Sequence, residues 1–329
     1  MYSKYRTLNQ TLSLINTRID LPRDAVLDQL VLKIGVTVAN GSAAAAYAGT
    51  NEAILRAIEE IRVVSDGSTV HYALSGADIA LLNRYNSKSG FAPALSGEVA
   101  IATSESKSLT YYLRLDEGDI LAASKDSLEL KMIVNPTITA DVTITALTCT
   151  VTLVENVLSP EEFIASYGPN LEYAAEPKVY ALTVPVTAST ELTSVLDLPT
   201  GSLARAGILQ FINSSTGLAG GKDPGAIGLI NTSPDRREVL HVDWATLQQI
   251  NASEYDLGAT VLPGVAMLNF AKDVTNDGYG LRGWRFTKGD WQIAAKGANA
   301  ANLRYICLEH VVNAGVFDAA ERAVLERTR

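Results

Sequence analysis

The chain has 329 residues, 47% of them hydrophobic and 19% charged, and a formal net charge of −9. That length predicts two domains, each able to bury a core, and the composition is typical of a β-rich globular protein. The acidic balance argues against sequence-specific nucleic-acid binding, and with neither a membrane-spanning apolar run nor an apolar signal core in the sequence, we expect a protein synthesised soluble in the cytoplasm.

Two strands are predicted near the N-terminus. Residues 8–19 and 28–38 largely alternate apolar and polar side chains, which places one face of each segment on a core. The period changes in residues 50–60, where a hydrophobic stripe and an N-cap at Thr50 or Asn51 predict a short helix.

A tight hairpin is predicted next. Residues 61–65 and 69–74 are strand-like and flank Asp66 and Gly67, a dipeptide that closes two-residue hairpin turns. The following stretch, 75–85, begins with a serine suited to capping and carries a helical stripe, so it predicts a second short helix.

The rest of the first half returns to strands after a long excursion. Residues 86–107 are rich in Ser, Gly, Lys and Ala and predict an exposed loop containing a short strand at 97–103. Strands are then predicted at 109–115, 128–134 and 142–155, and the last has the clearest alternation in the chain.

A helical joint is predicted after this strand. Ser159 is a cap, Pro160 takes the first helical position and Glu162 the third, which together predict a helix running to about Tyr167. Gly168 then ends it.

The second half is predicted to repeat the order of secondary-structure elements found in the first half. A glycine-rich excursion is expected at 216–226 and a short helix at 243–250. Strands are predicted at 179–187, 206–213, 226–231, 237–242, 262–270, 281–287, 290–295 and 303–312.

The two halves share an order of parts rather than an obvious identity. His71 precedes the helix of the first half as His241 precedes that of the second, and Cys149 and Cys307 lie in the two final strands. Only the helix at 50–60 lacks a counterpart. The chain therefore carries an internal structural repeat.

About eight strands per half, without crossover helices, favour antiparallel sandwiches over a parallel α/β sheet. The predicted fold class is all-β: two tandem eight-stranded antiparallel jelly-roll sandwiches, with short helices in loops and at the C-terminus. The predicted divisions are a first jelly roll at 1–157, a helical linker at 158–177, a second jelly roll at 178–313 and an amphipathic helix at 314–329.

This succession of parts resembles the double jelly-roll major capsid proteins of the tectivirus and adenovirus lineage, which includes small membrane-containing bacteriophages. The resemblance covers nearly the whole chain and rests on the order of elements, because no short motif carries it. It implies a structural protein of an icosahedral virion, forming pseudo-hexameric homotrimers that contact neighbouring capsomers. A separate penton protein and an inner viral membrane are further implied partners, and no enzyme activity, cofactor or metal is expected.

The same resemblance implies that the chain ends contact neighbouring subunits or face the membrane. Residues 316–328 are amphipathic, with their arginines late, where they suit the helix dipole. We expect this helix to pack on a neighbouring subunit or beneath the shell; folding back on its own domain is the alternative. The predicted inter-subunit contact residues are Lys4, Arg6, Phe317, Arg322, Val324 and Arg327.

A catalytic or zinc site is not indicated by the histidines and cysteines. His71, His241 and His310 lie in strand patterns without a nucleophile motif, which favours structural roles. His310 follows Cys307 by three residues, so on a strand the two side chains point to opposite faces. Cys149 and Cys307 are interpreted as core thiols, although the sequence leaves a disulfide between them open.

Two loop sequences invite comparison with ligand sites. Residues 217–226 resemble a phosphate-binding loop, but Asp223 stands where Ser or Thr should follow Lys222, so a flexible loop is favoured and an ion or nucleotide role is the alternative. Residues 273–280 are acidic but lack alternating calcium ligands, and Trp284 replaces the closing Glu, so a turn is favoured.

Two other function classes stay open at this stage. A tandem β-sandwich carbohydrate-binding or receptor-binding spike would need exposed aromatic residues, for which Trp284 and Trp291 are candidates, although core packing is the favoured interpretation. A paired jelly-roll glycan amidase would need acidic side chains that converge between the sandwiches.

Overall fold

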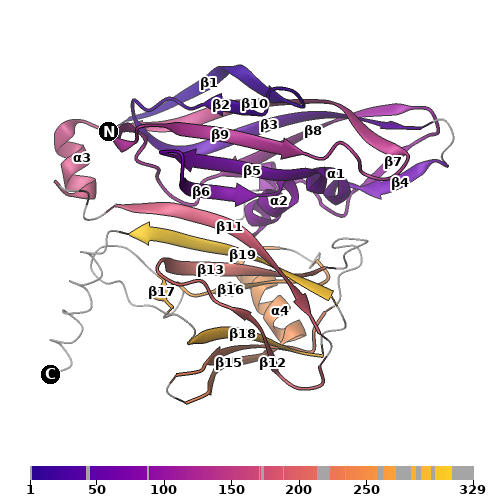
Figure 1. Cartoon of the computed structure of the whole chain (residues 1–329), viewed down its shortest axis with the longest axis vertical. Helices are drawn as coiled ribbons and strands as arrows, with labels where there is room; N and C mark the ends of the chain where they lie inside the picture. The colour runs from indigo at the N-terminus through magenta and orange to yellow at the C-terminus, as the bar shows by residue number, and fades with distance from the viewer. Residues whose placement is uncertain are drawn as a thin grey trace. The chain divides into compact units, whose positions relative to one another are not determined.

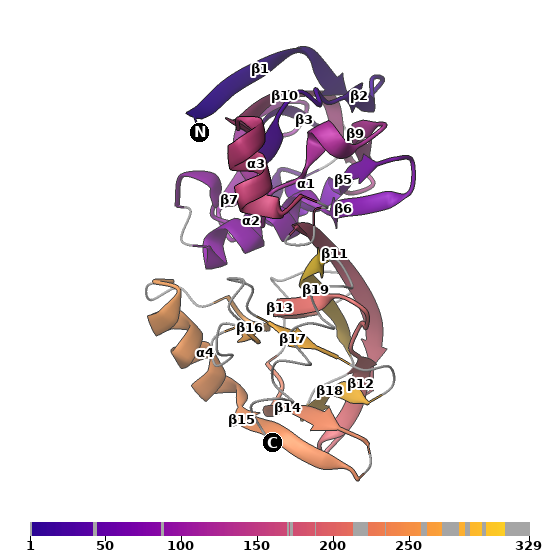
Figure 2. The ribbon, with the colours of Figure 1, turned by 90° about the vertical axis from the view of Figure 1, so that its left-hand side faces the viewer.

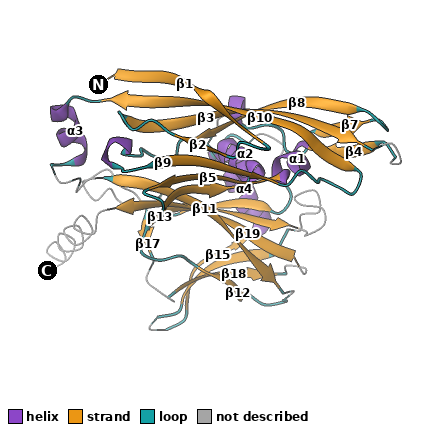
Figure 3. Ribbon diagram, turned by 45° about the horizontal axis from the view of Figure 1, so that its top comes forward, coloured by secondary structure: helices purple, strands orange, loops and turns teal. Residues whose placement is uncertain are grey.

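The structure is a computed structural model, and its strands greatly exceed its helices in the described residues (Figure 3). The described residues are 2–41, 45–86, 89–169, 171, 174–187, 189–212, 223–233, 235–257, 262–271, 283–286, 290–297 and 301–312. The chain divides into two compact units, Tyr2–Val157 and the part that begins at Leu158.

Eight strands of the first unit form two antiparallel layers of four (Figure 1). The layer ordered β1-β10-β3-β8 comprises β1 (Tyr2–Ser13), β10 (Val142–Val157), β3 (Val26–Asn40) and β8 (Ser106–Leu115). The layer ordered β6-β5-β9-β2 comprises β6 (Thr69–Leu74), β5 (Ile58–Ser65), β9 (Leu128–Val134) and β2 (Arg18–Asp20). Strands β4 (Tyr47–Thr50) and β7 (Glu98–Ile101) form a separate two-stranded antiparallel sheet.

The second unit repeats this arrangement. One layer, ordered β16-β13-β19-β11, comprises β16 (Val265–Asn269), β13 (Leu203–Ile212), β19 (Ala301–Val312) and β11 (Ala175–Val186), and β17 (Trp284–Arg285) also pairs with β13. The other layer, ordered β12-β18-β14-β15, comprises β12 (Thr193–Asp197), β18 (Trp291–Lys296), β14 (Ala226–Asn231) and β15 (Arg237–Asp243).

Both units have the strand order of a jelly roll. When the eight sandwich strands of each unit are numbered in chain order, one layer reads 1-8-3-6 and the other 2-7-4-5 in both units. This confirms the predicted fold class of two tandem eight-stranded antiparallel jelly rolls. The helices α2 (Gly76–Tyr85) and α4 (Trp244–Glu254) occupy equivalent places, between the fifth and sixth strands.

Alternation of side chains explains the layers. In β10 the residues Val142, Ile144, Cys149, Val151 and Leu153 are buried, and most of the intervening threonines face outward. A strand with this period buries one face on the facing sheet and leaves the other solvated.

The second core is more aromatic than the first. Phe211 and Trp244 pack edge to face with ring centroids 5.3 Å apart, among the buried Ile227, Ile293 and Leu303. Aromatic pairs in this geometry add about 0.5–1.5 kcal/mol beyond their area burial. Trp244, at the start of α4, thereby fixes the helix to the sandwich.

The turn and helix-cap residues that the sequence predicts have the expected local conformations. Asp66 and Gly67 both have positive φ, 52° and 71°, the conformation that a two-residue type I′ hairpin turn requires. Ser75 caps α2, and Ser159 caps α3 (Pro160–Tyr167), each through a capping box. Gly168, with φ of 79°, ends α3.

Some boundaries differ from the prediction for physical reasons. The helix expected at 50–60 is α1 (Asn51–Ala57), because Ile58 and the next residues extend β5 opposite β9. Strand β12 was not predicted, since it is a short edge strand with a weak pattern. The expected helix at 314–329 lies outside the described residues, as does most of the 216–226 loop.

One asparagine in each unit completes an edge strand. The Asn83 amide of α2 donates from Nδ2 to the backbone carbonyl of Arg114 in β8 at 2.6 Å, and its Oδ1 accepts from the Arg114 N–H at 2.9 Å. In the second unit Asn251 of α4 makes the same pair of bonds with Met267 of β16, at 3.1 and 2.6 Å. Both side chains are buried, and α4 packs along β15 and β16 (Figure 2).

Replacing Asn83 by Ala should expose this dependence. Asn83→Ala leaves the partly buried N–H and carbonyl of Arg114 without their side-chain partner, so we expect a loss of about 1–3 kcal/mol in the stability of the first unit. Hydrogen exchange should show the Arg114 amide exchanging at least about tenfold faster. The exposed Asn9→Ala is the control and should change stability by less than about 0.5 kcal/mol. Equal behaviour of the two variants would contradict the role of Asn83.

Candidate functional site

The three histidines do not converge. His71 is buried, with Nε2 2.9 Å from Ser65 Oγ, whereas His241 is exposed, with Nδ1 3.2 Å from Glu238. His310 Nε2 lies 3.3 Å from an Arg205 guanidinium nitrogen. Each ring therefore has a separate partner, on a neighbouring strand for His71 and His310 and on the same strand for His241, which suits the structural roles expected of them.

The cysteines are separate buried thiols. Cys149 lies in the first unit and Cys307 in the second, and both are free. Burial raises the pKa of Cys149 to about 12 and raises that of Cys307 well above its ordinary value. Both are core residues, and the disulfide that the sequence left open is not formed.

The tryptophans of the second unit belong to an aromatic cluster. The rings of Trp284 and Trp291 are 5.4 Å apart, and both contact the buried Phe286, at 6.2 and 5.5 Å. The two indoles are partly buried against the core. Core packing, the favoured interpretation of these residues, therefore describes them better than an exposed sugar-stacking surface.

Asp223 has a structural function that the loop sequence did not predict. Its Oδ1 accepts hydrogen bonds from Trp244 Nε1 at 2.8 Å and from the Gly264 N–H at 2.7 Å. This carboxylate therefore ties two segments of the second unit together. Lys222 and residues 273–280 lie outside the described residues.

Within the described ranges, no group of three or more His, Cys, Asp or Glu side chains is arranged to hold a metal ion. The helices that the structure describes include none with the length and apolar character needed to cross a bilayer.

An ion network anchors the N-terminal strand. The Arg6 guanidinium donates to Asp24 at 2.6 Å, and its Nε lies 3.0 Å from the buried Glu155 carboxylate of β10. Lys4 lies 3.7 Å from Asp24. The hydrogen bond from Arg6 lowers the pKa of Asp24, whereas burial raises the pKa of Glu155.

Lys4 and Arg6 were predicted as inter-subunit contacts from their position alone. Their bonds within the first unit were not foreseen, although Glu155 is the one acid in the predicted strand 142–155. The contact role stays a prediction. The other predicted contact residues, Phe317, Arg322, Val324 and Arg327, lie outside the described residues.

A comparable buried acid lies in the second unit. Glu309 of β19 is opposite Lys178 of β11, with Nζ 3.5 Å from the carboxylate, and Tyr180 donates a hydrogen bond to it at 3.4 Å. Burial raises the pKa of Glu309. Because its neighbours are a paired lysine and a phenol, the arrangement is a cross-strand ion pair rather than an acid and base pair.

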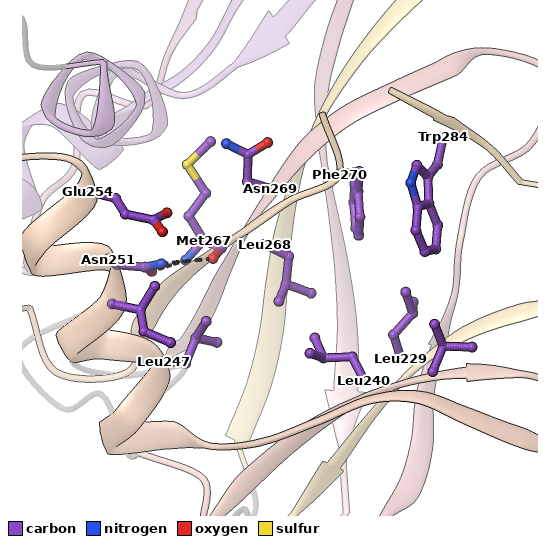
Figure 4. A pocket seen from close by; sticks show the side chains of 12 residues that line it. Leu229, Leu240, Leu247, Asn251, Glu254, Met267, Leu268, Asn269, Phe270 and Trp284 are labelled. Atoms are coloured by element: carbon purple, nitrogen blue, oxygen red, sulfur yellow. Dashed lines mark hydrogen bonds between the residues drawn. The ribbon is translucent and has the colours of Figure 1, made fainter. Parts of the chain in front are cut away.

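An apolar pocket of about 380 Å³ lies beside α4 in the second unit (Figure 4). Its walls include Leu240 of β15, Leu268 of β16 and Trp284. Its two asparagines are engaged: Asn251 binds the backbone of Met267, and Asn269 donates to the Tyr255 hydroxyl at 3.0 Å. The Glu254 carboxylate is the charged group in a lining that is otherwise mostly apolar (Figure 4).

The sequence of this chain matches no family model and no curated protein sequence. Solved structures, in contrast, match almost end to end. The crystal structure of the major capsid protein of STIV, the Sulfolobus turreted icosahedral virus, covers 97% of this chain and 99% of that chain, with a TM-score of 0.81 and 19% identity.

Two further structures match with lower scores. The major capsid protein of bacteriophage PM2 covers 95% of this chain and 98% of that chain, with a TM-score of 0.56 and 12% identity. The VP54 protein of PBCV-1 covers 94% of each chain, with a TM-score of 0.59 and 9% identity. The chain thus has the double jelly-roll fold of viral major capsid proteins, as the order of its elements predicted.

The burial of both thiols predicts low reactivity. With its pKa raised to about 12, Cys149 holds almost no thiolate at pH 8, and solvent does not reach it. We expect the folded chain to resist maleimide for hours and to take up two equivalents in denaturant, counted by mass spectrometry. Rapid labelling of the folded chain would contradict the described core.

Arg6→Gln tests the anchor of β1. The change leaves the Glu155 carboxylate buried without its cation, so we expect a loss of about 2–3 kcal/mol at neutral pH, measured by denaturant unfolding. A buried carboxyl with a raised pKa is stabilised by protonation as the pH falls, so the loss should shrink in acid. Lys4→Gln, which removes a more distant partner, should cost less than about 1 kcal/mol. A pH-independent loss would contradict this account.

Proposed function

We propose that the chain is the major capsid protein of an icosahedral virus. The observation that supports this most strongly is the match to the STIV major capsid protein over nearly the full length of both chains. A fold hosts many functions in general, but a chain that consists of two jelly rolls and little else has few described groups left for other chemistry.

The proposed assembly is a homotrimer. Three chains with two similar sandwiches each place six sandwiches around a threefold axis, so the oligomer presents nearly sixfold edges. Such pseudo-hexamers tile an icosahedral shell by repeated contacts with neighbouring capsomers. The fivefold positions require a different unit, for which we propose a separate penton protein.

The proposal extends to the location of the protein and to its contacts. The protein resides in the virion shell and is synthesised soluble in the host cytoplasm. Its ends, through Lys4 and Arg6 and through Phe317, Arg322, Val324 and Arg327, contact neighbouring subunits, and an inner viral membrane lies beneath the shell.

The domain divisions are proposed as folding units. These are the first jelly roll at 1–157, the linker at 158–177, the second jelly roll at 178–313 and the terminal helix at 314–329. The separation of compact units after Val157 supports the first of these boundaries.

We also propose that the chain is not an enzyme. A carbohydrate-binding spike or a glycan amidase would need exposed aromatic or convergent acidic groups. In the second unit Trp284 and Trp291 are instead packed on the core, and the similar structures are capsid proteins.

The assembly state tests the proposal directly. Light scattering on the purified full chain should give a mass three times the 35.1 kDa of one chain, and negative-stain microscopy should show pseudo-hexagonal particles or shells. A chain that remains monomeric at all concentrations and forms no particles would contradict a capsid function.

A further inference from the structure

One outer face of the first unit differs from an ordinary solvated sheet. It belongs to the layer β1-β10-β3-β8 and carries rows of threonines that project away from the core. We call it the threonine face. Its threonines include Thr7, Thr37, Thr110, Thr148, Thr150 and Thr152.

Charge is scarce on the threonine face. Lys33 and Arg114 are the charged residues at the outward positions of these four strands, all of which the structure describes. The chain has 27 Lys and Arg and 36 Asp and Glu residues, so these outward positions hold few of its charges. Depletion of charged residues distinguishes the centre of protein interfaces from the rest of a surface.

The other layer of the same sandwich is the internal comparison. Its outward positions carry charged neighbours on adjacent strands: Arg62 is opposite Lys131, and Lys131 is opposite Arg18. Glu129 bridges this row, at 2.5 Å from Arg18 and 2.9 Å from Lys131. That layer carries an ion-paired row of charged side chains across its strands, and the threonine face does not.

Two exposed tyrosines flank the threonine face. Tyr5 on β1 is 76% exposed and Tyr112 on β8 is 44% exposed, and each lies on an edge strand of the layer. An aromatic ring exposed to this extent buries much apolar area when a partner covers it, which is why tyrosine is enriched at interfaces.

The hydroxyls of the face bind one another across strands. Thr7 Oγ1 and Thr152 Oγ1 are 3.0 Å apart, and Thr37 Oγ1 and Ser108 Oγ are 3.1 Å apart. Groups already paired in this way lose less hydrogen bonding when water is removed than isolated hydroxyls do. The face can therefore be covered at low cost.

The area of the face is adequate for such a contact. Four strands spaced by about 4.8 Å give the face a width of about 19 Å, and the stretch of β10 from Thr143 to Thr152 gives it a length of about 30 Å. The product of the two is an area of about 570 Å². A contact that buries this much on each partner totals about 1,100 Å², just above the roughly 1,000 Å² expected of a specific interface. That size suits a weak contact repeated many times in an assembly.

We propose that the threonine face is a docking surface for a second copy of this chain. The inference rests on the proposed capsid function and adds to it the surface through which copies meet. A second copy is the occupant that this surface favours, because the two charged residues on it, Lys33 and Arg114, are cations and do not add to the repulsion between two chains with a net charge of −9.

The test places a charge in the middle of the face. Thr148 is exposed on β10, between β1 and β3, so Thr148→Arg puts an unpaired cation where the partner would sit. Sedimentation velocity on the full chain should show that half-assembly needs at least about tenfold more protein than wild type. Ser68→Arg, at the exposed tip of the β5–β6 hairpin, is the matched control and should assemble as wild type does.

A labelling experiment covers the case in which Thr148→Arg misfolds. Both natural thiols are buried, so a single Thr148→Cys thiol can be followed with maleimide. Its labelling should be at least about tenfold slower in the assembled protein than after dilution to the monomer, whereas Ser68→Cys should react equally in both.

The outcomes separate the two proposals. Normal assembly of a folded Thr148→Arg, or equal labelling of Thr148→Cys in both states, overturns the docking surface and leaves the capsid function standing. A wild-type chain that never assembles overturns both.

Discussion

Each sandwich depends on satisfying the backbone of its exposed edge. A jelly roll has open edges, and a strand there has unpaired N–H and carbonyl groups. In both units a helix between the fifth and sixth strands brings an asparagine, Asn83 or Asn251, whose amide takes the place of a further strand. The helix can do so because it is packed on the core, by the buried Leu81 and Leu82 of α2 in one unit and by Trp244 of α4 in the other. In both units, therefore, the helix that packs on the core also supplies the hydrogen bonds that complete an edge strand.

Charge is distributed in a way that fits the same plan. The buried acids Glu155 and Glu309 each lie on the final strand of a sandwich and each has a cation on the first strand, Arg6 or Lys178. A buried carboxylate is costly without a partner, so these pairs fix how the first strand aligns with the last. The outer surface of the first unit is divided differently, with ion-paired rows on one layer and hydroxyl rows on the other. The two outer faces therefore differ in charge, and the one with fewer charges is the proposed docking surface.

These features are compatible with the capsid function proposed above. The described histidines and thiols are dispersed into local contacts, and the amides of the apolar pocket beside α4 are engaged within the fold. The two similar units present similar surfaces for contacts with other protein chains. A shell built from many weak contacts needs rigid units with reproducible faces, and the double jelly roll supplies them.

The sequence by itself determined the fold class, the internal repeat and most of the turns and helix caps. Alternation in 142–155, the Asp66 and Gly67 turn and the Ser159 cap follow from short-range physics, so they could be read directly. The tertiary structure alone decided which partners meet across long separations: Asn83 with Arg114, Arg6 with Glu155, and Asp223 with Trp244. It also decided that strand β12 forms and that the threonines of separate strands share one face. Strand pairing brings distant residues together, and a single sequence carries no local signal of which distant residue that will be.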